Sequence, residues 1–158
     1  MYTVEKYLDM IRLNLSKQTN ELVKKIESLK TINFADEVKA LFIESSLGEP
    51  NISLDLTTME DMFNGVDSDE VEEGFAGYIQ LTDEFLFDEW QDDEAIEFYE
   101  ENDLEGSSIA EIAGWVKYCF DKAEGKVLGL PVYFEIHDNS YVLDLQIGEW
   151  VDPEEVEL

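Results

Sequence analysis

The feature of this sequence that most constrains its fold is a stretch of 77 residues without a positive charge. Between Ala40 and Val116 the chain has no Lys or Arg, whereas 23 residues of this stretch are Asp or Glu. Like charges repel appreciably within a Debye length of about 8 Å at physiological salt, so crowding these carboxylates costs the folded protein stability.

The charge of the whole chain divides into two unequal regions. The 158 residues have a net charge of -29. Residues 1–39 hold seven basic and six acidic residues, a net of +1, and residues 40–158 hold three basic and 33 acidic residues, a net of -30. One explanation is a generally acidic or halophilic surface without a specific role, although a net charge of roughly 2–8 already keeps a small domain soluble. The uneven distribution favours the other explanation, a negative surface that binds a partner.

The acidic residues of the second region gather in three runs, at residues 67–73, 88–94 and 100–105. Trp90 lies inside the second run, and interfaces commonly place Trp or Tyr at their centre while charge accelerates the encounter. A core position beneath the run is the other interpretation of Trp90. The first interpretation gives a set of candidate partner-binding residues: Asp67, Asp69, Glu70, Glu72, Glu73, Asp88, Glu89, Trp90, Asp92, Asp93, Glu94 and Glu97.

Length and composition predict one folded domain. A chain of 158 residues falls in the usual single-domain range of roughly 100–200 residues, and its 44% hydrophobic residues are enough to build a core. We expect a single acidic α+β domain over residues 1–158, with an acidic block at 40–116 and an acidic tail at 152–158. The sequence has neither the apolar stretch of a signal peptide nor a run long enough to span a membrane, so we expect a cytoplasmic protein.

The first segment predicts one long helix over residues 3–30. Apolar residues recur there at three- and four-residue steps, and the segment contains no Gly or Pro. Four leucines fall seven residues apart, which raises the alternative of a coiled-coil dimer, although the companion positions Gln18 and Lys25 are polar. We therefore favour a monomer in which this helix packs on the sheet of its own chain.

Three segments of the acidic block predict strands, at 41–43, 52–56 and 75–81, with a turn at 48–51 between the first two. In the second segment apolar and polar residues alternate, which is typical of a strand with one buried face. Residues 83–90 fit a helix and a strand equally well.

Two further helices are predicted beyond these strands. Asp92 or Asp93 can cap a short one. Residues Ser108–Glu111 match a capping box that opens a longer helix, and Gly125 is a natural end for it. Cys119 lies beside the apolar stripe of the longer helix and is predicted to be a small core residue. As the single cysteine, it forms no internal disulfide.

The end of the chain predicts a hairpin over residues 131–147, with residues 138–139 as a two-residue turn. This register places Phe134 opposite Leu143 and puts the apolar residues of both strands on one face. The sequence as a whole therefore predicts a mostly antiparallel sheet, made of two hairpins and an additional strand. The long N-terminal helix and one or two further helices would pack on one face of this sheet.

The sequence lacks the signature of an active site or a cofactor site. Residues 137–140 read His-Asp-Asn-Ser, but the members of a nucleophilic triad converge from separate segments rather than from one turn. Asp67 and Asp69 begin like a calcium loop that lacks the required glycine and final glutamate. No glycine-rich phosphate-binding motif is present. We expect no enzyme activity, no cofactor and no metal site; a carboxylate-based enzyme or a protein that binds divalent cations is the alternative.

The acidic surface indicates the kind of partner. Carboxylates repel nucleic acid and anionic membranes, so we expect neither as a direct partner, and they attract basic proteins by long-range steering. In size, charge and architecture the chain resembles bacterial toxin-immunity proteins, and this resemblance implies an inhibitor of a basic, nuclease-type toxin. The alternative is an inhibitor whose carboxylates imitate the phosphates of nucleic acid, as in phage anti-restriction and anti-CRISPR proteins.

Overall fold

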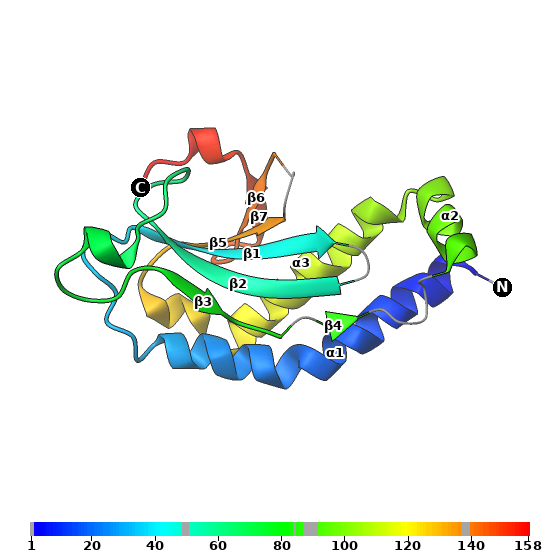
Figure 1. The fold of residues 1–158 in the computed structure, drawn as a ribbon, viewed down its shortest axis with the longest axis horizontal. Helices are drawn as coiled ribbons and strands as arrows, with labels where there is room; N and C mark the ends of the chain where they lie inside the picture. Colours follow the sequence, from blue (N-terminus) through cyan, green and yellow to red (C-terminus); the bar gives the residue numbers. More distant parts are fainter. Residues whose placement is uncertain (1, 49–50, 84, 87–91, 137–139) are drawn as a thin grey trace.

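The structure is a computed structural model that describes residues 2–48, 51–83, 85–86, 92–136 and 140–158. Two long helices, α1 (Val4–Leu29) and α3 (Leu104–Lys122), pack against each other and cover one face of a β-sheet. A shorter helix, α2 (Asp93–Glu101), lies at one end of the molecule beside the N-terminus (Figure 1). The predicted α+β class is confirmed.

The long N-terminal helix forms as predicted. Thr3 caps α1, because its Oγ1 accepts a hydrogen bond from the amide of Lys6 at 3.1 Å. The leucines at seven-residue spacing point into the core of their own chain, and three of them are at most 2% exposed: Leu15, Leu22 and Leu29. These side chains are therefore not at the surface, where a coiled-coil seam between two chains would need them.

The sheet has the strand order β3-β2-β1-β5-β6-β7, and β4 also pairs with β2. Its strands are β1 (Ala40–Gly48), β2 (Asn51–Met59), β3 (Tyr78–Gln80), β4 (Phe85–Leu86), β5 (Val132–Ile136), β6 (Val142–Asp144) and β7 (Glu149–Val151). Short 3₁₀ turns complete the fold: η1 (Ser68–Glu70), η3 (Gly125–Leu128) and η4 (Pro153–Glu155).

The expectation of a mostly antiparallel sheet is corrected to a mixed sheet, because β1 and β5 pair in parallel at its centre. Ile43 lies opposite Phe134 in this pair. The two predicted hairpins, β1–β2 and β5–β6, are both present. The alternation of apolar and polar residues within a hairpin does not predict which of its strands pairs with a strand of another hairpin. Leu41, Phe42 and Ile43 are all buried, and such a continuous apolar run is typical of a central strand covered on both faces.

The register of the last hairpin is confirmed. Phe134 pairs with Leu143, and the carbonyl of Val132 accepts a hydrogen bond from the amide of Leu145 at 3.0 Å. The predicted turn at residues 138–139 lies outside the described residues. The sequence did not predict the next strand, β7, which continues the sheet beyond β6.

A second, smaller core lies on the sheet face opposite the helices. Phe42 of β1 and Tyr133 of β5 meet there at a ring separation of 5.6 Å, and both side chains are almost fully buried. Val156, in the acidic tail at residues 152–158, packs against this cluster. Asp152 supports this arrangement by accepting a hydrogen bond from the amide of Glu154, which starts η4.

Of the two later helices, α2 begins where the sequence predicted and α3 does not. Asp92 caps α2 as predicted, because its Oδ1 accepts a hydrogen bond from the amide of Ala95 at 2.7 Å. The predicted start at Ser108 is wrong, since α3 begins four residues earlier at Leu104. The Ser108 hydroxyl donates to the Leu104 carbonyl at 2.7 Å within the helix, whereas a capping serine accepts from the amide that follows it.

The end of α3 depends on a close contact between Gly125 and Phe120. Glu124 adopts the left-handed conformation that ends the helix, with φ 54°, and Gly125 then begins η3 instead of capping α3 itself. A Cβ atom built on Gly125 would lie 2.2 Å from the ring of Phe120, which is fully buried in the core. Any other residue at position 125 must therefore displace a core side chain.

This contact gives a prediction for stability. We expect Gly125→Ala to lower the free energy of unfolding by about 1–3 kcal/mol, because the new methyl group overpacks the Phe120 ring. Gly114→Ala is the matched control: nothing lies within 4 Å of its Cβ position in α3, so the better helix former should stabilise the protein by up to about 1 kcal/mol. Urea denaturation of both variants measures these changes. Equal effects of the two substitutions would contradict the predicted contact.

Candidate acidic interface

The two acidic segments that were predicted to bind a partner lie at opposite ends of the molecule. Residues 67–73, called here the acidic loop, lie near the end of α1, whereas residues 92–97 lie near its beginning (Figure 1). The 26 residues of α1, at 1.5 Å each, separate these ends by about 39 Å. A standard interface of roughly 800 Å² per partner is only about 30 Å across, so one contact of this size does not cover both ends.

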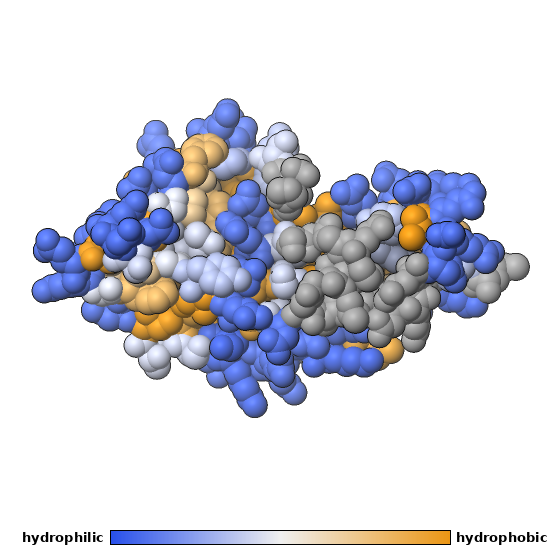
Figure 2. All heavy atoms as spheres, in the orientation of Figure 1, coloured by the Kyte–Doolittle hydropathy of each residue, from blue (hydrophilic) through white to orange (hydrophobic). Residues whose placement is uncertain are grey.

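The predicted partner-binding residues that the structure describes are all exposed. The acidic loop contributes Asp67, Asp69, Glu70, Glu72 and Glu73, and the other end contributes Asp92, Asp93, Glu94 and Glu97. In the orientation of Figure 1, hydrophilic residues are numerous at both ends of the molecule (Figure 2). Asp88, Glu89 and Trp90 lie outside the described residues.

The acidic loop is held against the segment that follows α1. The amide of Ala35 donates to the Phe75 carbonyl at 2.9 Å, and the amide of Phe75 donates to the Asn33 carbonyl at 2.7 Å. Gly74 lies between these bonds, with φ +85°. It is so close to Ala35 that a Cβ atom added to Gly74 would lie 2.7 Å from the Ala35 Cα. Only glycine combines this backbone angle with this approach. The loop is thus fixed next to residues 33–37.

Thr58 of β2 forms hydrogen bonds with Val66 and Gly77, the residues on either side of the acidic loop. This fully buried hydroxyl donates to the carbonyl of Val66 at 2.9 Å and accepts from the amide of Gly77 at 2.8 Å. Within the loop, the Asp67 amide donates to the Glu70 carboxylate at 3.3 Å, and η1 forms between these residues. The run of carboxylates therefore has a defined backbone path.

The acidic loop and residues 33–37 enclose an acidic hollow of about 510 Å³. Five carboxylates line it: Asp36, Glu37, Glu70, Glu72 and Glu73. Sequence reasoning missed Asp36 and Glu37, because they belong to the charge-balanced first 39 residues and only the fold brings them beside the loop. The Lys39 ammonium donates to the backbone carbonyl of Asp36 at 2.7 Å. In the described parts of the chain, none of the five carboxylates forms a salt bridge.

An exposed aromatic residue stands at the same end of the molecule. Phe63 is 63% exposed in the turn that follows β2. The Asp61 carboxylate holds this turn by accepting hydrogen bonds from the amides of Phe63 and Asn64, both at 2.8 Å. Together with the side chain of Asn64, these bonds hold the pKa of Asp61 below its usual range. The sequence analysis did not single out Phe63, since one apolar residue in a turn carries no periodic signal.

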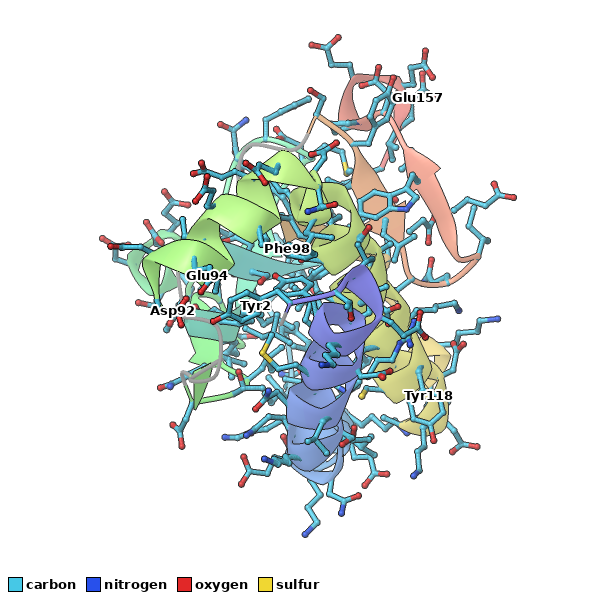
Figure 3. All side chains as sticks on the ribbon, turned by 90° about the vertical axis from the view of Figure 1, so that its right-hand side faces the viewer. Tyr2, Asp92, Glu94, Phe98, Tyr118 and Glu157 are labelled. Carbon is cyan, nitrogen blue, oxygen red and sulfur yellow. The ribbon has the colours of Figure 1, made fainter. Side chains whose placement is uncertain are left out.

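At the other end, Tyr2 joins the N-terminal segment to α2. Its hydroxyl donates to the Asp92 carboxylate at 2.6 Å, and its ring centroid lies 6.2 Å from that of Phe98. The bond to Asp92 raises the pKa of Tyr2 to about 12 and lowers the pKa of Asp92. Figure 3 shows Tyr2, Asp92, Glu94 and Phe98 gathered at this end. Sequence reasoning cannot find this contact, because its two partners are 90 residues apart.

A row of carboxylates crosses the sheet face opposite the helices. Glu44 of β1 lies opposite Asp55 of β2 and opposite Glu135 of β5, and neighbouring strands are about 4.8 Å apart. Burial, followed by the charges of Glu135 and Asp55, raises the pKa of Glu44. A hydrogen bond with Asp55 raises the pKa of Tyr78 at the side of this row. The row is invisible in the sequence because it depends on the parallel pairing of β1 with β5.

The cations of the described ion pairs lie on α1, on α3 or at the end of α1. Arg12 of α1 bonds to Glu111 of α3 at 2.7 Å, and Lys117 bonds to Asp121 at 2.8 Å and to the Leu145 carbonyl at 2.7 Å. No cluster of three or more His, Cys, Asp or Glu residues suited to a metal ion occurs among the described residues. Likewise, no helix in the described ranges is long and apolar enough to cross a membrane.

Comparisons with protein-family models, with curated proteins and with solved structures found no significant match to this chain.

The carboxylate row gives a prediction for pH dependence. Because the pKa of Glu44 is raised in the folded protein, its ionisation weakens the fold as the pH rises from its ordinary pKa of 4.5 through the folded value. We expect Glu44→Gln to raise the free energy of unfolding by about 1 kcal/mol at pH 7. At pH 3.5, where the carboxyl group is protonated in both states, the gain should disappear.

Urea denaturation of the protein and its variants at the two pH values measures this difference. The control is Glu157→Gln, which removes one negative charge from an exposed position outside the strands. A gain of the same size in the control would show that general charge repulsion, not the row, destabilises the protein.

Proposed function

We propose that this protein binds and neutralises a basic protein through the end of the molecule that carries the acidic loop. The observation that supports this most directly is the acidic hollow, where five exposed carboxylates gather on a defined backbone without a salt bridge to any described Lys or Arg. Crowding like charges costs stability, and a cationic surface on a partner would relieve that cost.

The same end has the two properties of a tight interface. A cluster of carboxylates accelerates the encounter with a basic protein, and a surface that is already ordered loses little conformational entropy on binding. The hydrogen bonds of Thr58 and Gly74's close contact with Ala35 order the loop before a partner arrives. Phe63 supplies an exposed aromatic side chain that a partner can bury as an anchor.

The partner that fits this surface best is a protein with a basic, phosphate-binding groove. A nuclease uses such a groove to hold its substrate, and carboxylates on a fixed loop can occupy the positions that phosphates would take. This supports the role of an immunity protein against a nuclease-type toxin. In this proposal the protein acts by occupying the groove and performs no reaction of its own.

A second candidate is an inhibitor that imitates nucleic acid along its whole length. The carboxylates at the two ends, with the carboxylate row on the sheet between them, favour this candidate. Duplex DNA carries one charge per about 1.7 Å, so a length of about 39 Å corresponds to roughly 23 phosphate charges. A mimic would use this length to bind proteins that share only an affinity for DNA.

The test begins with affinity capture of partners from the organism that produces the protein, followed by binding measurements with each purified partner. We expect one basic nuclease, inhibited at a one-to-one ratio. Phe63→Ala should weaken its affinity about 30-fold, equivalent to about 2 kcal/mol. The double variant Glu72→Gln/Glu73→Gln should slow association about tenfold at low salt. The matched control Leu13→Ala, at a 55% exposed position on α1, should leave both constants unchanged.

Several outcomes distinguish the two candidates. A mimic would bind many unrelated DNA-binding proteins, and the loss of one carboxylate pair or of Phe63 would change its affinity little. Capture of acidic proteins only, or of a basic protein whose binding is unaffected by both variants, would contradict the proposal for the acidic loop.

A further inference from the structure

A second cavity lies at the opposite end of the molecule from the acidic loop. It has a volume of about 420 Å³ and is called here the aromatic pocket; its lining residues are Tyr2, Glu94, Glu97, Phe98 and Glu101. Cavities that bind small ligands begin at roughly 300 Å³. This one is therefore large enough for one or two side chains of a partner.

The pocket is assembled from one face of α2 and the segment before α1. Glu94, Glu97, Phe98 and Glu101 are three or four residues apart, so they share one face of the helix. Tyr2 closes the other side, and its bond of 2.6 Å to Asp92, the residue that caps α2, fixes the ring. This bond raises the pKa of Tyr2 to about 12, and the protonated hydroxyl is the donor of the bond at neutral pH.

The two kinds of side chain in the pocket attract the same chemical group. The faces of Tyr2 and Phe98, whose centroids are 6.2 Å apart, carry the negative end of a quadrupole that attracts cations. Both rings are half-buried, whereas Glu94, Glu97 and Glu101 are exposed around them. A cation in the pocket would therefore contact a ring with its apolar surface and carboxylates with its N–H groups.

We propose that the aromatic pocket binds an organic cation, namely the guanidinium or ammonium group of an Arg or Lys side chain on a basic protein. A planar guanidinium stacks on an aromatic ring and donates two N–H groups to one carboxylate, which uses every feature of this site. A bare divalent metal would gain nothing from the rings. Free polyamines carry the same ammonium chemistry and are the other source of such a cation.

This inference does not depend on the function proposed for the acidic loop. The two sites are separated by the length of α1, about 39 Å, and share no residue. Substitutions in one site therefore report on that site alone.

The test is an NMR titration of the whole protein, following the aromatic resonances of Tyr2 and Phe98. The probes are N-acetyl-arginine amide, spermidine for the polyamine source, N-acetyl-norleucine amide as an uncharged analogue, and magnesium chloride. We expect saturable shifts of both rings with the arginine probe and none with the norleucine probe. A preference for spermidine over arginine would support the pocket and assign the cation to a polyamine.

Variants separate the rings from the charge. Phe98→Leu should weaken binding of the arginine probe by three- to thirtyfold, because it keeps the apolar volume but removes the ring, whereas Phe98→Tyr should retain binding. Glu97→Gln, at an exposed position on α2, should also weaken binding. The control Phe63→Leu, at the other end of the molecule, should have no effect.

Three results would overturn the inference. One is unchanged binding in Phe98→Leu, which would leave only general attraction to acidic residues. Another is equal binding of the uncharged analogue, which would show that the cation is not recognised. The third is displacement of the arginine probe by magnesium chloride at concentrations where sodium chloride of equal ionic strength has no effect.

Discussion

The parallel pairing of β1 with β5 is the constraint on which the rest of the structure depends. It joins the two hairpins into one sheet and sets Ile43 beside Phe134 in the core under α1 and α3. On the other face it sets Phe42 beside Tyr133 in the smaller core. Apolar side chains thus pack on both faces of these central strands, although Glu44 and Glu135 share one of the faces. The described carboxylates that were predicted to bind a partner lie elsewhere, on the acidic loop and around α2, where they are exposed to water.

The sequence predicted local structure well because each of those predictions depends on neighbouring residues. The N-terminal helix, the Asp92 cap and the pairing of Phe134 with Leu143 are confirmed. The predicted start of α3 was wrong because the Ser108 hydroxyl bonds to the Leu104 carbonyl inside the helix. The same hydroxyl lies 3.0 Å from the hydroxyl of Tyr7, which is 101 residues away in the sequence. The mixed sheet and the distance between the two acidic segments could not be predicted from the sequence for the same reason, because both depend on pairings between distant segments.

The candidate sites show the same limit. The residues of the acidic loop were predicted from their own run of charge, but Asp36 and Glu37 join them only through the contact of Gly74 with Ala35. Tyr2 reaches α2 across 90 residues. Most of the few cations in described ion pairs hold helices or helix ends in place, as Arg12 does between α1 and α3. None of these described ion pairs involves the five carboxylates of the acidic hollow.

The length of α1 has a consequence beyond packing. A helix with both ends anchored, at Tyr2 by Asp92 and near Phe34 by Phe75, acts as a rigid spacer between two acidic sites. A ligand with two cationic regions about 39 Å apart would meet both sites at once, and the second contact would form at a high effective concentration without a flexible linker. A shorter basic ligand would reach only one of them. If both proposed sites bind cations, the helix would select a ligand by the spacing of its positive charges as well as by their number.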